Sequence, residues 1–358
     1  MNQDKPSRRG GDGGAKESRL TDPQSLKEKL HAQLPQPQSS TQSDIAQILK
    51  DAMPSMLRRF FLTTLLFACI AVGAAFYFPV ENAQLLASSS AKITNRLVSA
   101  PKYAQMQQLH TATGQPSVQV LAKYPHDSEA FTQGLLVAKQ GESKFFIEST
   151  GLLGKSTLRK VTIETGEVLG KYDLPSELFG EGVALTKDTG ELVMLTWKSR
   201  KGFVFQAQSD ASAPFTLERE FEFSTVTGEG WGIDSDGDSH LIVSDGSATL
   251  MFWDSASLKE VRRIDVTFRG HQIAQLNELE FANGFIYANI WYEKLIAKID
   301  PASGVIVAVF DCSALADALT TGDNQGAVLN GIAYDGDEDV FYLTGKLWNT
   351  VYKVRLLE

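Results

Sequence analysis

One short motif recurs five times along the sequence, and in each copy a polar side chain precedes an apolar run. The copies occupy residues 131–135, 179–183, 227–231, 275–279 and 328–332. The first four are spaced by 48 residues and the last by 53. The equivalent central positions hold Gln133, Glu181, Glu229, Asn277 and Asn330. A fixed period of this length is typical of repeat architectures, so the chain is expected to build five similar units.

Each motif copy is followed by two further short apolar runs, and turn residues separate them. The second runs lie at 145–147, 192–195, 241–243, 285–290 and 340–343, and the third at 158–163, 203–205, 249–253, 295–299 and 351–354. Loop signals such as Glu-Thr-Gly-Glu at 164–167 then lead to a fourth run. Four short strands in each repeat are typical of a propeller blade, so residues 116–358 are predicted to form an all-β, five-bladed propeller.

The fifth repeat lacks a fourth strand, because only two apolar runs follow its motif before the chain ends at Glu358. Residues 118–123, which precede the first motif, have no partner within the first repeat. An N-terminal strand that completes the last blade would remove an exposed sheet edge. The sequence therefore predicts that residues 118–123 close the fifth blade.

Three segments with other compositions precede this region. Residues 1–57 are rich in Gln, Ser, Pro, Gly and Lys and are expected to be a disordered tail. The nineteen residues from Phe60 to Phe78 carry no charge. A helix of this length is long enough to span a bilayer. A buried core helix is the alternative reading of this run. Residues 79–115 contain many small or polar residues, as expected for a stem.

The charges that flank residues 60–78 predict the orientation of this segment. Arg58 and Arg59 precede it, and Glu81 is the first charged residue after it. The positive-inside rule then places the tail in the cytoplasm and the C-terminal region outside. The chain is thus expected to be a single-pass type II membrane protein with a signal anchor, attached through residues 60–78, with its C-terminal propeller on the lumenal or extracytoplasmic side.

Net charge and cysteine content exclude two classes of protein. The formal net charge is -9 and the isoelectric point is near 5.2, whereas a nucleic-acid binder needs a basic face. The two cysteines, Cys69 and Cys312, are too few for a disulfide framework. We therefore expect no nucleic-acid partner and no fold that depends on disulfides.

The five central motif positions are expected to converge, because the first strand of each propeller blade lines the central channel. A cluster of carboxylates and amides is costly to bury unless its members bond each other, water or a ligand. The channel could also be merely hydrated, with these side chains capping neighbouring strands. At this level nothing distinguishes Glu181 from Glu229.

Aromatic side chains and one cation are predicted near one mouth of the central channel, close to these motif positions. Trp197, Trp291 and Trp348 follow the second strands of three repeats, and Trp231 lies in the third motif itself. Tryptophan is often a core residue, but nearly equivalent loops in several blades favour an aromatic pocket. Lys346 is the cation that the pattern points toward this pocket.

Further motifs occur in order between residue 124 and the C-terminus: Tyr-Pro-His-Asp at 124–127, Glu-Ser-Thr-Gly-Leu at 148–152, Leu-Thr-Trp-Lys at 195–198, Gly-Glu-Gly-Trp-Gly at 228–232 and Leu-Asn-Gly-Ile-Ala-Tyr-Asp at 329–335. On these motifs the chain resembles the plant and bacterial type glutaminyl-peptide cyclotransferases, or glutaminyl cyclases. The resemblance implies a five-bladed propeller that converts N-terminal glutamine of peptides or proteins to pyroglutamate and releases ammonia. It implies no catalytic metal and no cofactor.

The resemblance also implies an active site. Glu181 is its general acid/base, and the other matching positions are Phe131, Gln133, Trp231, Asn277, Trp291 and Lys346, with Trp197 added to the same wall. The chemistry suits these groups, since one carboxylate with a raised pKa can take a proton from the attacking amine and return it to the leaving amine. Asn277 and Lys346 can stabilise charge on the amide oxygen. Gln133 can orient the substrate, and the aromatic side chains can hold it folded.

Two other function classes remain open at this stage. Channel carboxylates and amides also make calcium sites in propeller lactonases, and Glu181, Glu229, Asn277 and Asn330 offer oxygen ligands. A chelator would inactivate such a lactonase. A non-catalytic, membrane-tethered binding propeller is the third class, and it would release no ammonia from a peptide that begins with glutamine.

Overall fold

The computed structural model describes residues 118–206, 213–319 and 326–358, all within the compact unit Ala87–Glu358. The predicted tail (1–57), membrane segment (60–78) and stem (79–115) lie outside these described residues. Among the residues that are described, no helix is long and apolar enough to cross a membrane.

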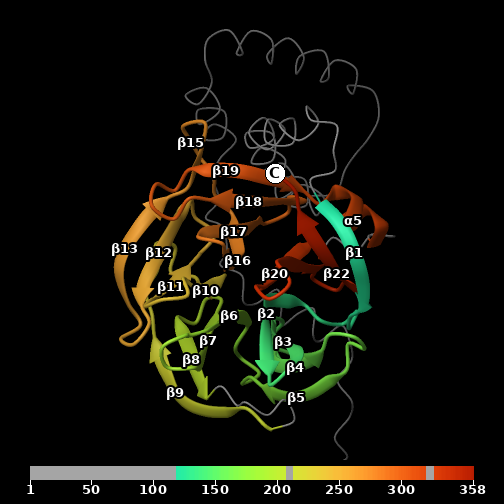
Figure 1. Ribbon diagram of the computed structural model, residues 1–358. Helices are drawn as coiled ribbons and strands as arrows, with labels where there is room; N and C mark the ends of the chain where they lie inside the picture. Colours follow the sequence, from blue (N-terminus) through green and yellow to red (C-terminus); the bar gives the residue numbers. More distant parts are fainter. Residues whose placement is uncertain (1–117, 207–212, 320–325) are drawn as a thin grey trace, which may run out of the picture. The chain divides into compact units, whose positions relative to one another are not determined.

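Five four-stranded antiparallel sheets are arranged as blades around a ring, as Figure 1 shows. Blade 1 contains β2 (Thr132–Gln140), β3 (Ser143–Thr150), β4 (Thr157–Thr162) and β5 (Val168–Asp173). Blade 2 contains β6 (Gly180–Leu185), β7 (Glu191–Thr196), β8 (Lys201–Gln206) and β9 (Thr216–Glu222). Blade 3 contains β10 (Ile233–Ser235), β11 (His240–Val243), β12 (Thr249–Asp254) and β13 (Lys259–Asp265).

Blade 4 contains β16 (Leu276–Ala282), β17 (Phe285–Ile290), β18 (Leu295–Ile299) and β19 (Ile306–Asp311). Blade 5 contains β20 (Leu329–Asp335), β21 (Val340–Gly345), β22 (Thr350–Leu356) and, as its outermost strand, β1 (Val118–Pro125). The all-β, five-bladed propeller is therefore confirmed.

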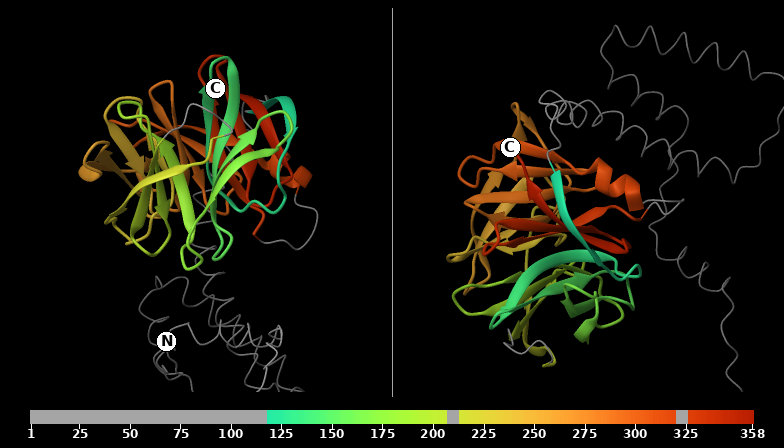
Figure 2. Two further views of the ribbon diagram at one scale, coloured as in Figure 1. Left: turned by 90° about the horizontal axis from the view of Figure 1, so that it is seen from below. Right: turned by 45° about the vertical axis from the view of Figure 1, so that its right-hand side comes forward.

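The N-terminal strand closes the ring as predicted. β1 pairs antiparallel with β22, from Val118 opposite Leu356 to Pro125 opposite Thr350. Figure 2 shows the two strands side by side, although they come from opposite ends of the propeller sequence. Blade 5 thereby gains its fourth strand, and the last hydrogen-bonding edge of β22 is covered.

Two small elements interrupt the regular pattern. The helix α5 (Ser313–Leu319) lies in the connection between blades 4 and 5. This connection holds the additional residues that lengthen the last motif spacing to 53. A two-stranded hairpin, β14 (Thr267–Phe268) with β15 (His271–Gln272), lies in the connection between blades 3 and 4. Neither element was predicted, because both lie in connections outside the repeated pattern of apolar runs.

The hydrophobic core is divided among the five junctions between blades. Alternate residues of a strand face opposite neighbours: Phe145 and Ile147 of β3 pack toward blade 2, whereas Phe146 packs toward blade 5. Both faces of the middle strands are therefore buried, which explains why these strands read as continuous apolar runs rather than alternating ones. Each of the five junctions has its own cluster of buried side chains.

The motif residues lie in β-bulges at the start of the inner strands. The pairing register shifts around Gln133, Glu181, Asn277 and Asn330 in β2, β6, β16 and β20. A bulge re-aims the side chain that it carries, so it can turn these polar groups away from the sheet. The following glycines let neighbouring strands approach closely: a Cβ on Gly134 would lie 2.6 Å from Val183 N, and one on Gly182 would lie 2.7 Å from Trp231 O.

The fourth copy has Glu278 where the other copies have glycine. Its carboxyl group reaches two other blades and accepts hydrogen bonds from Leu135 N at 3.2 Å and Ile332 N at 2.8 Å. Burial raises the pKa of Glu278 well above its ordinary value, although these two backbone donors oppose the rise. Glu278 thus ties the inner strands of blades 1, 4 and 5 together.

Candidate active site

The starts of the inner strands and the loops between the second and third strands lie at the same end of the ring, because the strands of each blade are antiparallel. This end carries Phe131, Trp197, Trp231, Trp291 and Lys346, each of which borders one of these segments. Together with the bulge residues Gln133, Glu181 and Asn277, they form what we call the mouth site. Backbone hydrogen bonds join the segments, as from Trp197 N to Phe179 O at 3.0 Å.

Glu181 is the buried acid of the mouth site. Only 5% of the residue is exposed, and its Oε1 accepts a hydrogen bond from Gln133 Nε2 at 3.1 Å. Burial raises the pKa of Glu181 well above its ordinary value; the ammonium of Lys346 opposes this rise and the carboxylate of Glu229 adds to it. A carboxyl group with a raised pKa is suited to exchange protons near neutral pH.

Lys346 is the buried base of the same site. It directly follows β21, and its Nζ lies 4.8 Å from the centre of the Phe131 ring. Burial lowers the pKa of Lys346 to about 8, while the Glu181 carboxylate acts in the opposite direction. Among the charged groups of the described residues, only Glu181 acts to raise this pKa. Glu181 and Lys346 therefore form an acid and a base whose titrations depend on each other.

Two amide oxygens of the mouth site are buried without a protein partner. Within the described ranges, Gln133 Oε1 and Asn277 Oδ1 have no hydrogen-bond donor, although both residues are only 2% exposed. A buried acceptor without a donor is costly unless water or a ligand supplies one. Both oxygens are thus available to N–H groups of a bound molecule.

Aromatic rings line the mouth site in two groups. Phe131, Phe179 and Trp197 follow one another, with ring centres 6.1 Å and 5.6 Å apart. Trp231 and Trp291 meet edge to face, with centres 5.2 Å apart at 81°. Trp291 in turn contacts Tyr292, with ring centres 4.4 Å apart. The groups come from different blades, so packing between neighbouring blades brings them together.

Glu229 joins the two aromatic groups, which motif position alone did not reveal. Its Oε2 accepts hydrogen bonds from Trp197 Nε1 at 2.7 Å and from Trp231 Nε1 at 2.9 Å. Glu229 lies before β10 rather than within the inner strand, unlike its four counterparts. Phe179 and Tyr292 were also missed as wall residues. Their positions beside Gly180 and Trp291 were the available signals.

The expectation for Trp348 was wrong, whereas Asn330 follows one of the two readings left open for the motif positions. Trp348 is only 1% exposed and packs in the core between blades 4 and 5, beside Tyr352. Asn330 is fully buried, and its Nδ2 donates to Thr132 O at 3.0 Å, so it caps a neighbouring strand. Asn330 thus follows the strand-capping reading, whereas Gln133 and Glu181 face each other in the site.

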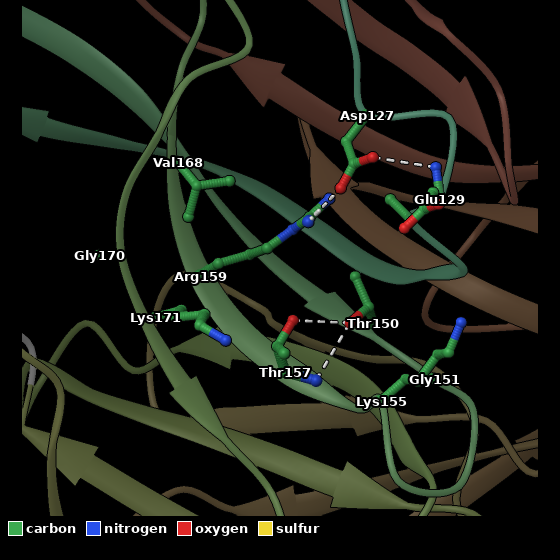
Figure 3. A pocket seen from close by; sticks show the side chains of 11 residues that line it. Asp127, Glu129, Thr150, Gly151, Lys155, Thr157, Arg159, Val168, Gly170 and Lys171 are labelled. Carbon is green, nitrogen blue, oxygen red and sulfur yellow. Dashed lines mark hydrogen bonds and ion pairs between the residues drawn. The ribbon is translucent and has the colours of Figure 1, made fainter.

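A pocket of about 440 Å³ lies beside blade 1 and is lined in part by residues of β4 and β5 (Figure 3). Its lining includes Asp127, Lys155, Arg159 and Lys171. Arg159 bonds Asp127 and the buried Glu148, and the cationic partners hold the pKa of Glu148 at about 2 despite its burial. The pocket contains none of the residues predicted for catalysis. Within its lining, Arg159 and Asp127 pair with each other.

In the described ranges, no group of three or more His, Cys, Asp or Glu side chains is arranged so that it could hold a metal ion. Among the oxygens considered for a calcium site, Glu229 Oε2 already accepts two indole N–H groups. Asn330 donates through Nδ2 to Thr132 O, and its Oδ1 has no hydrogen-bond partner among the described residues.

Comparison with known proteins gives consistent matches. The family model described as glutamine cyclotransferase matches residues 91–356. A glutaminyl-peptide cyclotransferase of Arabidopsis thaliana is 35% identical over 300 residues, which cover 76% of this chain and 89% of that protein. The crystal structure of the Myxococcus xanthus glutaminyl cyclase superposes with a TM-score of 0.59 at 36% identity, covering 66% of this chain and 95% of that one.

Proposed function

The chain belongs to the glutamine cyclotransferase family, and on this premise we propose that the mouth site converts N-terminal glutamine of peptides or proteins to pyroglutamate. The observation that carries the proposal is the buried Glu181 carboxyl group, which has a raised pKa and faces Gln133 within an aromatic enclosure. The enzyme is a transferase of the glutaminyl-peptide cyclotransferase class.

Glu181 performs both proton transfers of the reaction. The α-amine of the substrate attacks the carbon of its own γ-carboxamide, and Glu181 accepts the proton that the attacking nitrogen loses. The same carboxyl group then gives this proton to the carboxamide nitrogen as its bond to carbon breaks and ammonia leaves. A positioned acid/base of this kind contributes roughly 10²–10⁴-fold to the rate.

Lys346 and Asn277 stabilise the intermediate between these two transfers. When the amine attacks, the carboxamide oxygen gains negative charge, and the Lys346 ammonium is the cation of the mouth site that can compensate it. The amide of Asn277 can donate to this oxygen, while its unpaired Oδ1 accepts an N–H of the substrate. Gln133 Oε1 is available to the substrate amine in the same way.

The aromatic rings hold the glutaminyl side chain in its folded form. Cyclisation is intramolecular, so its rate depends on keeping the amine nitrogen about 3 Å from the carboxamide carbon. Phe131, Trp197, Trp231 and Trp291 surround the site with flat apolar faces that restrict the extended conformers of the side chain. The enclosure also excludes water, which strengthens the electrostatic terms.

Ammonia release tests this proposal against its alternatives. A peptide that begins with glutamine should release ammonia with the wild-type protein, and a peptide that begins with asparagine should not. Prior treatment with a calcium chelator should leave the rate unchanged. Absence of ammonia from the intact protein would overturn the proposal. Calcium-dependent hydrolysis of a lactone would then favour the lactonase reading, and absence of both activities would favour the binding propeller.

For the N-terminal region we propose a membrane anchor. The uncharged run at 60–78 and the arginines before it support a single-pass type II arrangement with the propeller on the extracytoplasmic side. Protease added to sealed vesicles should distinguish an epitope at residues 1–57 from one at the C-terminus. Equal protection of the two epitopes would overturn this arrangement.

A further inference from the structure

Glu229 connects the two aromatic groups of the mouth site through one oxygen atom. Its Oε2 accepts both indole N–H groups, at 2.7 Å from Trp197 and 2.9 Å from Trp231. We propose that Glu229 is a positioning residue that fixes these two indoles as the walls that recognise the folded glutaminyl end. This inference rests on the proposed function and assigns a further residue to the same site.

Each of the two indoles has further contacts that the Glu229 bonds complete. Lys198 Nζ lies 4.0 Å from the centre of the Trp197 ring and 3.6 Å from Glu229 Oε1. Trp231 packs edge to face on Trp291, and its backbone oxygen accepts Gly182 N at 2.8 Å. Each ring is therefore held at its face or edge by a neighbour and at its nitrogen by Glu229.

The loop that carries Glu229 is itself well restrained. Thr225 Oγ1 donates to Glu229 O at 2.7 Å, and Thr227 N donates to Asp245 Oδ2 at 2.7 Å. Gly228 has a φ of 78°, which turns the backbone just before Glu229. Because β10 begins only at Ile233, this turn leaves the side chain free of the sheet and directs it to the indoles.

Glu229 has two effects in the mouth site: it accepts the indole hydrogen bonds, and its negative charge raises the pKa of Glu181. Substitutions can separate these two effects. The indole bonds need an acceptor oxygen, whereas the effect on the Glu181 carboxyl group needs a negative charge. Glu229→Gln keeps an acceptor oxygen and removes the charge. Glu229→Ala removes both. A merely structural role would not distinguish these two variants.

Steady-state kinetics with a glutamine-initiated peptide test the positioning role. Glu229→Ala should raise KM about tenfold and change kcat less than about threefold, because two rings lose their fixed orientation. Glu229→Gln should keep KM within about threefold of wild type and move the acidic limb of kcat/KM to lower pH. The exposed Glu222→Gln on β9 is the matched control and should change neither. A KM for Glu229→Ala within about twofold of wild type would overturn the proposal, as would equal KM values for the Gln and Ala variants.

The indole N–H resonances give a readout that needs no activity. The full chain has five tryptophans, and the signals of Trp197 and Trp231 are assigned with Trp→Phe variants after ¹⁵N-tryptophan labelling. Both signals should move in Glu229→Ala, and unchanged signals would overturn the proposal. If wild-type protein releases no ammonia, the proposed function fails, but the resonances still decide whether Glu229 binds both indoles.

Discussion

Gln133 and Glu181 occupy the same motif position in neighbouring blades, and Gln133 Nε2 donates a hydrogen bond to Glu181 Oε1 at 3.1 Å. Each residue lies in the bulge that opens its inner strand. The repeat therefore brings an amide and a carboxylate together at the ring axis, although the two residues are 48 positions apart in the sequence. This pairing leaves the other amide atom, Gln133 Oε1, for a ligand.

Removing the amide of Gln133 should weaken the reaction. Gln133→Leu deletes the donor to Glu181 and the unpaired acceptor while keeping a similar volume. Since a hydrogen bond to a charged group contributes about 1.5–3 kcal/mol, kcat/KM should fall about 10- to 100-fold. Circular dichroism should show an unchanged fold. A variant with wild-type kcat/KM would show that this amide does not contact the substrate or its acid.

The pH profile should report both titrating groups of the mouth site. Glu181 has a raised pKa, so the acidic limb of kcat/KM should lie above the ordinary glutamate range. Lys346 has a pKa of about 8 and must stay protonated to stabilise the oxyanion, so activity should decline as pH rises through about 8.

Lys346→Met separates these two limbs. The variant should lose activity at every pH, and its acidic limb should move to higher pH because Glu181 loses the cation that favours its charged form. The decline near pH 8 that belongs to Lys346 should disappear. An acidic limb that stays in place would contradict electrostatic coupling between Lys346 and Glu181.

Trp291 should contribute mainly to substrate binding. Trp291→Ala removes the edge-to-face partner of Trp231 and opens one wall of the site. The expected result is a rise in KM of about tenfold with a smaller change in kcat, since aromatic anchors of this type dominate binding energies. Trp348→Phe offers a comparison, because that ring lies in the core and should affect stability instead. A pure kcat effect of Trp291→Ala would assign this ring a different role.

The contribution of Asp234 to stability should fall as pH rises through the acidic range. Burial raises the pKa of Asp234 from 3.8 to about 7. Between these pH values the folded protein binds a proton that the unfolded chain does not, so this contribution to stability is lost as pH rises. Asp234→Asn should flatten the dependence of Tm on pH between about 4 and 7, whereas the exposed Asp238→Asn should not. An unchanged slope in Asp234→Asn would contradict the raised pKa.

Strand number, blade number and ring closure could be predicted because they follow from local signals. Apolar runs such as 192–195 and 203–205 alternate with turn residues at a nearly constant period. The missing strand of blade 5 followed from counting, and β1 supplies it. Glu181 could be proposed as the acid only through the family motifs, since the repeat treats Glu181 and Glu229 alike.

The parts that could not be predicted depend on contacts between distant residues. Trp348 and Trp197 both follow second strands, but Leu347 has a φ of 61° and the Trp348 ring turns into the core against Tyr352. Glu229 differs from Glu181 because β10 starts late, which leaves Glu229 in a loop. Bulges and loop turns of this kind are set by packing between blades rather than by the local sequence.

The turnover rate of Glu181→Gln tests the central claim most directly. The rate of ammonia release from a glutamine-initiated peptide is measured at saturating substrate for wild type, Glu181→Gln and the exposed Glu222→Gln. We expect kcat of Glu181→Gln to fall by at least about 10²-fold, with KM and thermal stability close to wild type and Glu222→Gln unaffected. A Glu181→Gln variant that retains the wild-type kcat would contradict the assignment of Glu181 as the group that transfers the proton.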